Sequence, residues 1–145
     1  ATAIQAAAVQ EPALFPATGL VRDSIRLIPD DAFGFDKLDR VYAATYSENE
    51  STMTAFLSNR SSKQAAAELA AAYRDFLVQF GGTDLSGQSN LDIPGASVIE
   101  ILGTIEIIFT RGAYLAGVHE AADLPSAAAV ARKLYHRLEE GRIAK

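Results

Sequence analysis

Apolar and polar residues alternate in several short stretches of the chain, which is the pattern of β-strands that bury one face. Two of these stretches flank the polar segment 47–51, and this arrangement predicts a β-hairpin. Gly103 and Arg111-Gly112 interrupt the later stretches and predict further turns between antiparallel strands. The six predicted strands cover residues 24–28, 40–46, 52–58, 97–102, 104–110 and 113–118.

A first segment repeats its apolar residues every three or four positions, as an amphipathic helix does. Ser61 and Gln64 have the spacing of a capping box at its start, and Gly81-Gly82 predicts its end. The polar loop 83–95 follows. The stripe expected to be buried consists of Leu69, Tyr73, Phe76, Leu77 and Phe80.

A second helix is predicted from Asp123, its N-cap, to Gly141. The elements then follow the order βββα-βββα, which predicts an α+β fold: an antiparallel sheet of about six strands with two amphipathic helices packed on one face. Residues 1–20 are expected to form an extended arm whose Leu14 and Phe15 pack on a single domain, residues 21–145. The buried stripe of the second helix consists of Val130, Ala131, Leu134, Tyr135 and Leu138.

Two carboxylates, Glu100 and Glu106, are equally distant from Gly103 and would lie opposite one another if Gly103 were the centre of a hairpin. Such a pair serves as general acid and base when burial separates its pKa values. However, both alternate with isoleucines, so we expect both to face solvent. The opposite face of the second strand is expected to lie under both helices and comprises Ile105, Ile107 and Phe109.

Composition narrows the class of protein. The chain has 145 residues, 49% of them apolar and 21% charged, which fits one globular domain with its own core. The net charge of -5 argues against a nucleic-acid partner. The absence of cysteine excludes disulfides and thiolate chemistry, and no apolar run approaches the ~20 residues of a transmembrane helix.

The string His119-Glu120-Ala121-Ala122-Asp123 begins like the zinc-protease motif, in which two histidines one helical turn apart flank a glutamate. Here Asp123 replaces the second histidine. The string also falls between a strand and a helix, so the alternative is a polar loop with Asp123 as the helix cap. His119, Glu120 and Asp123 remain the catalytic candidates, and we expect neither a metal nor a cofactor.

Five aromatic residues are candidates for lining a ligand cleft, although aromatic residues of a half-buried sheet more often belong to its core. They are Phe33, Phe35, Tyr42, Tyr46 and Tyr114.

Several strings together resemble an uncharacterised bacterial family of predicted exported proteins, a domain of unknown function. The resemblance spans roughly residues 16–138 and implies an α+β fold and a periplasmic or cell-envelope location. It implies no activity, cofactor or site residue. The strings are Ser24-Ile25-Arg26, Phe33-Gly34-Phe35, Tyr42-Ala43-Ala44-Thr45-Tyr46 and Thr54-Ala55-Phe56, followed by the Ala-rich helix.

The sequence thus favours a non-enzymatic binding or protein-interaction module of the cell envelope, whose partner is a protein or a small apolar ligand. One alternative is a hydrolase or other enzyme that uses His119 with Glu120 or Asp123. Another is a structural subunit that assembles through an exposed edge strand. The sequence leaves the oligomeric state open.

Overall fold

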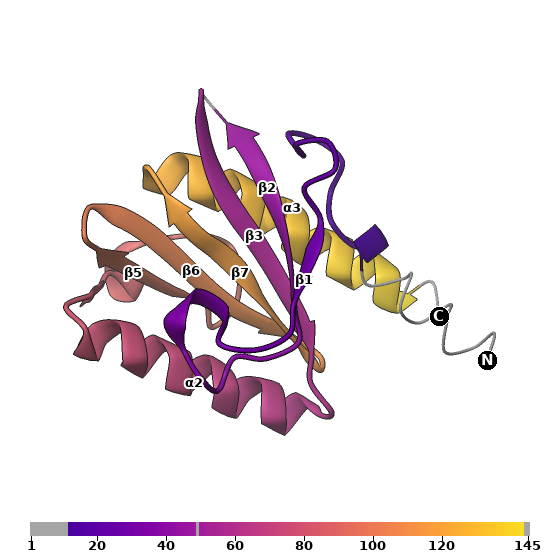
Figure 1. Ribbon diagram of the computed structural model, residues 1–145. Helices are drawn as coiled ribbons and strands as arrows, with labels where there is room; N and C mark the ends of the chain where they lie inside the picture. The colour runs from indigo at the N-terminus through magenta and orange to yellow at the C-terminus, as the bar shows by residue number, and fades with distance from the viewer. Residues whose placement is uncertain (1–11, 49, 144–145) are drawn as a thin grey trace.

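The computed structural model describes residues 12–48 and 50–143 and shows an α+β protein with one antiparallel sheet and two long helices (Figure 1). The sheet has seven strands rather than about six, because the predicted loop 83–95 contains the two-residue strand β4. The strands are β1 (Arg26–Ile28), β2 (Val41–Glu48), β3 (Ser51–Asn59), β4 (Thr83–Asp84), β5 (Ser97–Ile101), β6 (Thr104–Arg111) and β7 (Tyr114–Ala121). The helices are α2 (Lys63–Gln79) and α3 (Leu124–Ile143), with short 3-10 turns η1 (Ala32–Gly34) and η2 (Ser86–Gln88).

The spatial order of the strands is β1-β2-β3-β7-β6-β5-β4, and all neighbours are antiparallel. After the first three strands, α2 carries the chain across the sheet to its far edge. The last four strands then return one by one until β7 pairs with β3. The centre of the sheet is therefore a long-range pairing of its two halves.

The two helices cover opposite faces of the sheet, so the prediction that both pack on one face is wrong. α3 packs on β3, β6 and β7, above a core that includes Ile107 and Phe109. α2 packs on β5, β6 and β7, above a second core that includes Ile108. Neighbouring residues of a strand point to opposite faces, and Figure 1 shows α3 behind the sheet and α2 in front of it. We call the two sides the α3 face and the α2 face.

Burial on both faces explains the error. Residues 105–109 of β6 are buried without interruption. Ile105, Ile107 and Phe109 form one layer, as predicted, but beneath α3 alone. Alternation identifies the solvent side only where one face of a sheet is open to water, and here the second face lies beneath α2.

The turn between β5 and β6 also differs from the prediction. It consists of Leu102 and Gly103, both with positive φ (52° and 82°), so its centre lies between them and not at Gly103. Glu100 consequently pairs with Ile105, and Glu106 pairs with Ile99. The two carboxylates lie on opposite faces and cannot act as a pair.

The helices begin and end close to their predicted positions. Ser62 rather than Ser61 caps α2, because its side chain accepts a hydrogen bond from the Ala65 N–H at 3.0 Å. Phe80 comes just after the last turn of α2 and is 65% exposed, contrary to the expectation that it is buried. α3 continues past Gly141 to Ile143.

Leu14 and Phe15 are buried in the core of the α3 face, as expected. The chain around them forms turns rather than an extended segment, with hydrogen bonds from Phe15 N–H to Pro12 O and from Leu20 N–H to Ala17 O. Most of the predicted arm, residues 1–11, lies outside the described residues, so the division at residue 20 stays a prediction. Neither α2 nor α3 is long and apolar enough to cross a membrane.

Candidate functional site

A β-bulge in β7 brings His119 and Glu120 together opposite Glu106. Ile107 pairs with Val118, but Ile105 pairs with Ala121, so β7 contains one extra residue at this point. Glu120 has a φ of 57°, a left-handed conformation that glutamate rarely adopts. Bulges re-aim side chains and occur frequently next to functional sites.

Glu106 is a buried acid, with a side chain only 2% exposed, contrary to the prediction that it faces solvent. Its Oε1 lies 2.8 Å from His119 Nδ1 and accepts a second hydrogen bond, at 3.4 Å, from the Tyr73 hydroxyl of α2. Its Oε2 accepts from the backbone N–H of Glu120 at 2.8 Å. Three donors from β7 and α2 therefore replace the water that the carboxylate loses on folding.

His119 connects this acid to the surface. Its side chain is 20% exposed, and its Nε2 lies 3.5 Å from Oε1 of Glu120. The ring of Phe33 stacks on it, with 4.1 Å between ring centroids and an interplanar angle of 24°. We call these residues the Glu106 cluster: Glu106, His119, Glu120, Tyr73 and Phe33.

Burial raises the pKa of the Tyr73 hydroxyl, and the negative charge of the neighbouring Glu106 raises it further. The hydrogen bond to Glu106 acts in the same direction, because the protonated hydroxyl is the donor. Tyr73 therefore acts in this cluster as a neutral hydrogen-bond donor.

Phe33 belongs to the segment 29–40, which we call the strap. The strap follows β1 and lies in front of the sheet beside α2 (Figure 1, indigo). Hydrogen bonds from Arg40 N–H to Pro29 O (3.0 Å) and from Ala32 N–H to Leu38 O (2.9 Å) close it into a loop. Asp31, Phe33 and Arg40 all have positive φ, between 53° and 55°. Strained backbone of this kind persists only where its surroundings hold it, and it concentrates at functional sites.

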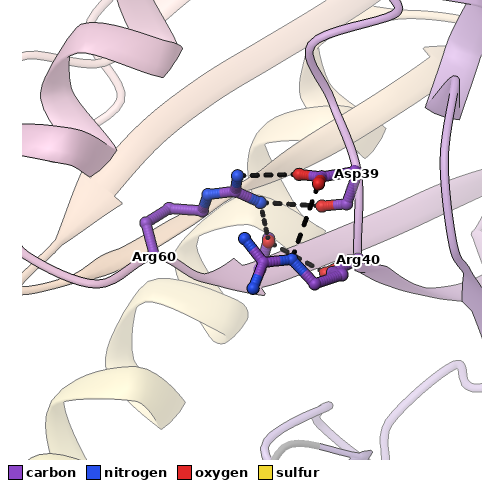
Figure 2. A network of polar contacts seen from close by, with 4 residues as sticks. Asp39, Arg40 and Arg60 are labelled. Carbon is purple, nitrogen blue, oxygen red and sulfur yellow. Dashed lines mark hydrogen bonds and ion pairs between the residues drawn. The ribbon is translucent and has the colours of Figure 1, made fainter.

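Arg60 fixes the C-terminal end of the strap, as Figure 2 shows. Its Nη2 lies 2.8 Å from Asp39 Oδ1, and its Nη1 donates to the Asp39 carbonyl at 2.7 Å and to Ser58 Oγ at 2.8 Å. Ser58, which is fully buried in β3, donates in turn to the Arg40 carbonyl. The hydrogen bond from Arg60, with the charges of Arg60 and Arg40, holds the pKa of Asp39 below its ordinary value. This end of the strap is therefore tied to β3.

Aromatic rings continue from the Glu106 cluster along α2 to the surface. Phe33 lies 6.4 Å from Tyr73, Tyr73 lies 5.7 Å from Phe35, Phe35 stacks on Phe76 at 4.6 Å, and Phe76 lies 4.8 Å from Phe80. We call these five residues the aromatic row. The strap supplies Phe33 and Phe35 to it, and the other three come from α2 and its end. The row therefore reaches from the half-buried His119 to the exposed ring of Phe80.

The three catalytic candidates are not brought together. His119 and Glu120 are neighbours in the Glu106 cluster. Asp123 instead caps α3, where its Oδ1 accepts from the Ser126 N–H at 2.8 Å, as the alternative interpretation of the string predicted. Both ring nitrogens of His119 lie against carboxylates, whereas a general base needs one directed at a substrate. Within the described residues, no group of three or more His, Asp or Glu side chains is arranged to hold a metal ion.

The five aromatic candidates divide between the two faces. Phe33 and Phe35 lie on the α2 face and belong to the aromatic row. Tyr42, Tyr46 and Tyr114 belong to the core of the α3 face, where the Tyr46 hydroxyl donates to the Pro16 carbonyl at 2.5 Å. The sheet separates the two groups, so the five do not line one common cleft.

The sequence analysis did not identify Glu106 and Tyr73 as partners of His119. The available signal was Glu106 itself, an acid within the apolar run Ile105-Glu106-Ile107-Ile108-Phe109. An acid enclosed in a strand that is apolar on both sides of it is a candidate for a buried, hydrogen-bonded group. Its partners come from other segments and depend on the strand register.

Comparisons of the chain with protein-family models, with curated proteins and with solved structures found no match. The arguments about function below therefore rest on the chain itself.

Proposed function

We propose that the protein is a non-enzymatic binding module of the bacterial cell envelope, and that an apolar ligand contacts the α2 face at the aromatic row. The observation that carries the proposal is the exposed end of the row. Phe80 is 65% exposed and continues, through Phe76, into stacked rings that the strained strap holds in place. A cluster of apolar side chains that reaches the surface is typical of interaction sites.

A second exposed apolar residue, at the β5–β6 hairpin, supports the proposal that the α2 face binds an apolar ligand. Leu102, at the tip of the β5–β6 hairpin, is 94% exposed, and Ile101 beside it packs against the core of the α2 face. Thr83, which follows the end of α2 closely, pairs with Glu100. The pairing of Thr83 with Glu100 therefore brings the chain that follows α2 beside β5, the strand that leads to Leu102.

The cell-envelope location rests on the resemblance of the strap and the first strands to the exported bacterial family. The ligand is either a small apolar molecule or an apolar segment of another protein, and the same surface suits both. An experiment with one probe of each kind distinguishes them.

Titration of the ¹⁵N-labelled protein with indole, and separately with a short peptide that contains two phenylalanines, tests the proposal. We expect one of the two probes to change the amide chemical shifts of Phe76, Phe80 and the strap. Phe80→Ser should weaken that binding by roughly fivefold or more, the effect of losing about 1 kcal/mol. Leu27→Ser is the matched control, because Leu27 is also an exposed apolar residue (51%) but lies on the edge strand β1. Equal effects of the two variants, or no shifts on the α2 face, would contradict the proposal.

The alternative of an enzyme that uses His119 with Glu120 draws support from the buried Glu106, which orients the imidazole as the acid of a catalytic dyad does. Against it stands the position of Glu120 beside Nε2. Turnover of an ester or amide substrate that disappears in His119→Gln would favour this alternative.

The alternative of assembly through an edge strand has less support, because both edges of the sheet are short. β1 has three residues and β4 has two, and short edge strands limit pairing with other chains. Gly19 and Val21 hydrogen bond to β2 beyond the end of β1 and cover that part of the edge. A mass that increases with concentration in light scattering would revive this alternative.

A further inference from the structure

The strap contacts the Glu106 cluster through the stack of Phe33 on His119, a contact whose strength depends on the charge of the imidazole. The end of the strap at Asp39 is tied to β3 through Arg60. At the tip, Ala32 and Phe35 are buried in the core of the α2 face, whereas Phe33 is half-buried and lies flat on the imidazole. The strained φ of Phe33 opposes this arrangement, so the stack must help to maintain it.

The protonation state of His119 changes the strength of its contacts. A protonated ring donates toward Glu106 from Nδ1, faces Glu120 with Nε2, and presents a cation to the Phe33 ring. A neutral ring that keeps its proton on Nδ1 loses the cation–π attraction and turns a lone pair toward the Glu120 carboxylate. The protonated ring therefore holds Phe33 more tightly than the neutral ring does.

The titratable groups around the ring come from three elements. β6 contributes Glu106, β7 contributes Glu120, and α2 contributes Tyr73, which reaches the ring through Glu106. From the strap, the residue in contact with the ring is Phe33, which does not titrate. His119 is thus the ionisable side chain that the strap contacts directly, through Phe33.

We infer that the strap is a pH-sensitive gate, which closes on the aromatic row when His119 is protonated and loosens when His119 is neutral. This inference rests on the proposed function for the purpose of the gate, because Phe33 and Phe35 are the rings that the strap supplies to the row. Loosening would move the half-buried Phe33 away from the imidazole and change the surface that a ligand meets there.

Amide hydrogen exchange of the protein without any ligand tests the gate. The reporter is the N–H group of Ala32, next to Phe33, whose hydrogen bond to the Leu38 carbonyl closes the strap. Exchange is followed by NMR from about pH 5 to about pH 9, a range that spans histidine titration, while the ring signals of His119 report its protonation. We expect the protection factors, corrected for the intrinsic pH dependence of exchange, to fall by roughly three- to thirtyfold as His119 loses its proton, the range that loss of one cation–π contact gives.

Two variants separate the gate from a general loss of stability. His119→Gln keeps a hydrogen-bond donor but cannot be protonated, so its strap should exchange at the faster level at every pH. His136→Gln is the matched control, because His136 lies on α3 with its side chain 67% exposed and should leave the pH dependence unchanged. Constant protection while His119 titrates in the natural protein would overturn the gate, as would an unchanged pH dependence in His119→Gln. Because no ligand is present, a failure here is distinct from a failure of indole or the peptide to bind.

Discussion

Burial of a carboxylate costs free energy unless hydrogen bonds replace its hydration. At Glu106 this replacement is provided by Tyr73, by His119 and by the backbone of Glu120. Each of these donors in turn loses its acceptor if the carboxylate is removed. Glu106 therefore links β6 to α2 and β7 through hydrogen bonds.

We expect Glu106→Ala to lower the free energy of unfolding by about 3–5 kcal/mol, because Tyr73, His119 and the Glu120 N–H all lose their common acceptor. Urea unfolding measures the change. Glu100→Ala is the matched control, since Glu100 is exposed on the neighbouring strand and should cost less than about 0.5 kcal/mol. Equal and small effects of the two substitutions would contradict the burial of Glu106.

At the scale of elements, local sequence signals predict that a helix forms, but they locate its ends only to within about one residue. Ser61 and Ser62 both precede the apolar stripe of α2, and either is a good N-cap. The structure uses Ser62, so the helix begins one position later than a cap at Ser61 implies. At the other end, Phe80 follows the helical period but is the C-cap residue, and its side chain is 65% exposed.

Ser62→Ala is expected to destabilise the protein by about 1 kcal/mol, because the Ala65 N–H loses its acceptor at the start of α2. Thermal or urea unfolding measures the effect. Ser61→Ala serves as the control and should leave the stability nearly unchanged. A larger loss for Ser61→Ala would restore the capping box first predicted at Ser61 and Gln64.

The whole molecule is a helix–sheet–helix sandwich in which each face of the sheet buries one large tyrosine. Tyr46 is 1% exposed on the α3 face, and Tyr73 is fully buried on the α2 face. Burial raises the pKa of both hydroxyls above the ordinary value of tyrosine, about 10. High pH therefore destabilises both cores, because each one keeps its tyrosine hydroxyl protonated.

The stability of the protein is expected to fall as the pH rises above about 10. The folded state keeps two protons that the unfolded chain releases, so this contribution is fully present below that pH and is lost above it. The fall should approach about 2.7 kcal/mol per pH unit for two such groups. Urea unfolding as a function of pH measures the slope, which Tyr46→Phe or Tyr73→Phe should reduce by about half. A slope that neither variant changes would contradict the prediction.

Much of the local structure followed from the sequence because its causes are local. The period of the apolar residues identified the β2–β3 hairpin and both helices, and Asp123 was recognisable as the cap of α3 from the residues next to it. The α+β class follows from these elements. Leu14 and Phe15 lie in a stretch without a clean period, and their apolar character alone predicted that they pack on the domain, where both are buried.

The tertiary structure alone decided which face each helix covers, and the candidate site depends on that decision. Alternation in β6 shows that Glu106 and Ile107 point to opposite sides, but not that both sides are buried. Tyr73 and Glu106 are 33 residues apart and meet only because α2 crosses the α2 face on its way to the far edge of the sheet. The bulge that aims His119 at Glu106 depends on the register of β7 against β6, which is set by contacts along the whole sheet rather than by the residues at the bulge.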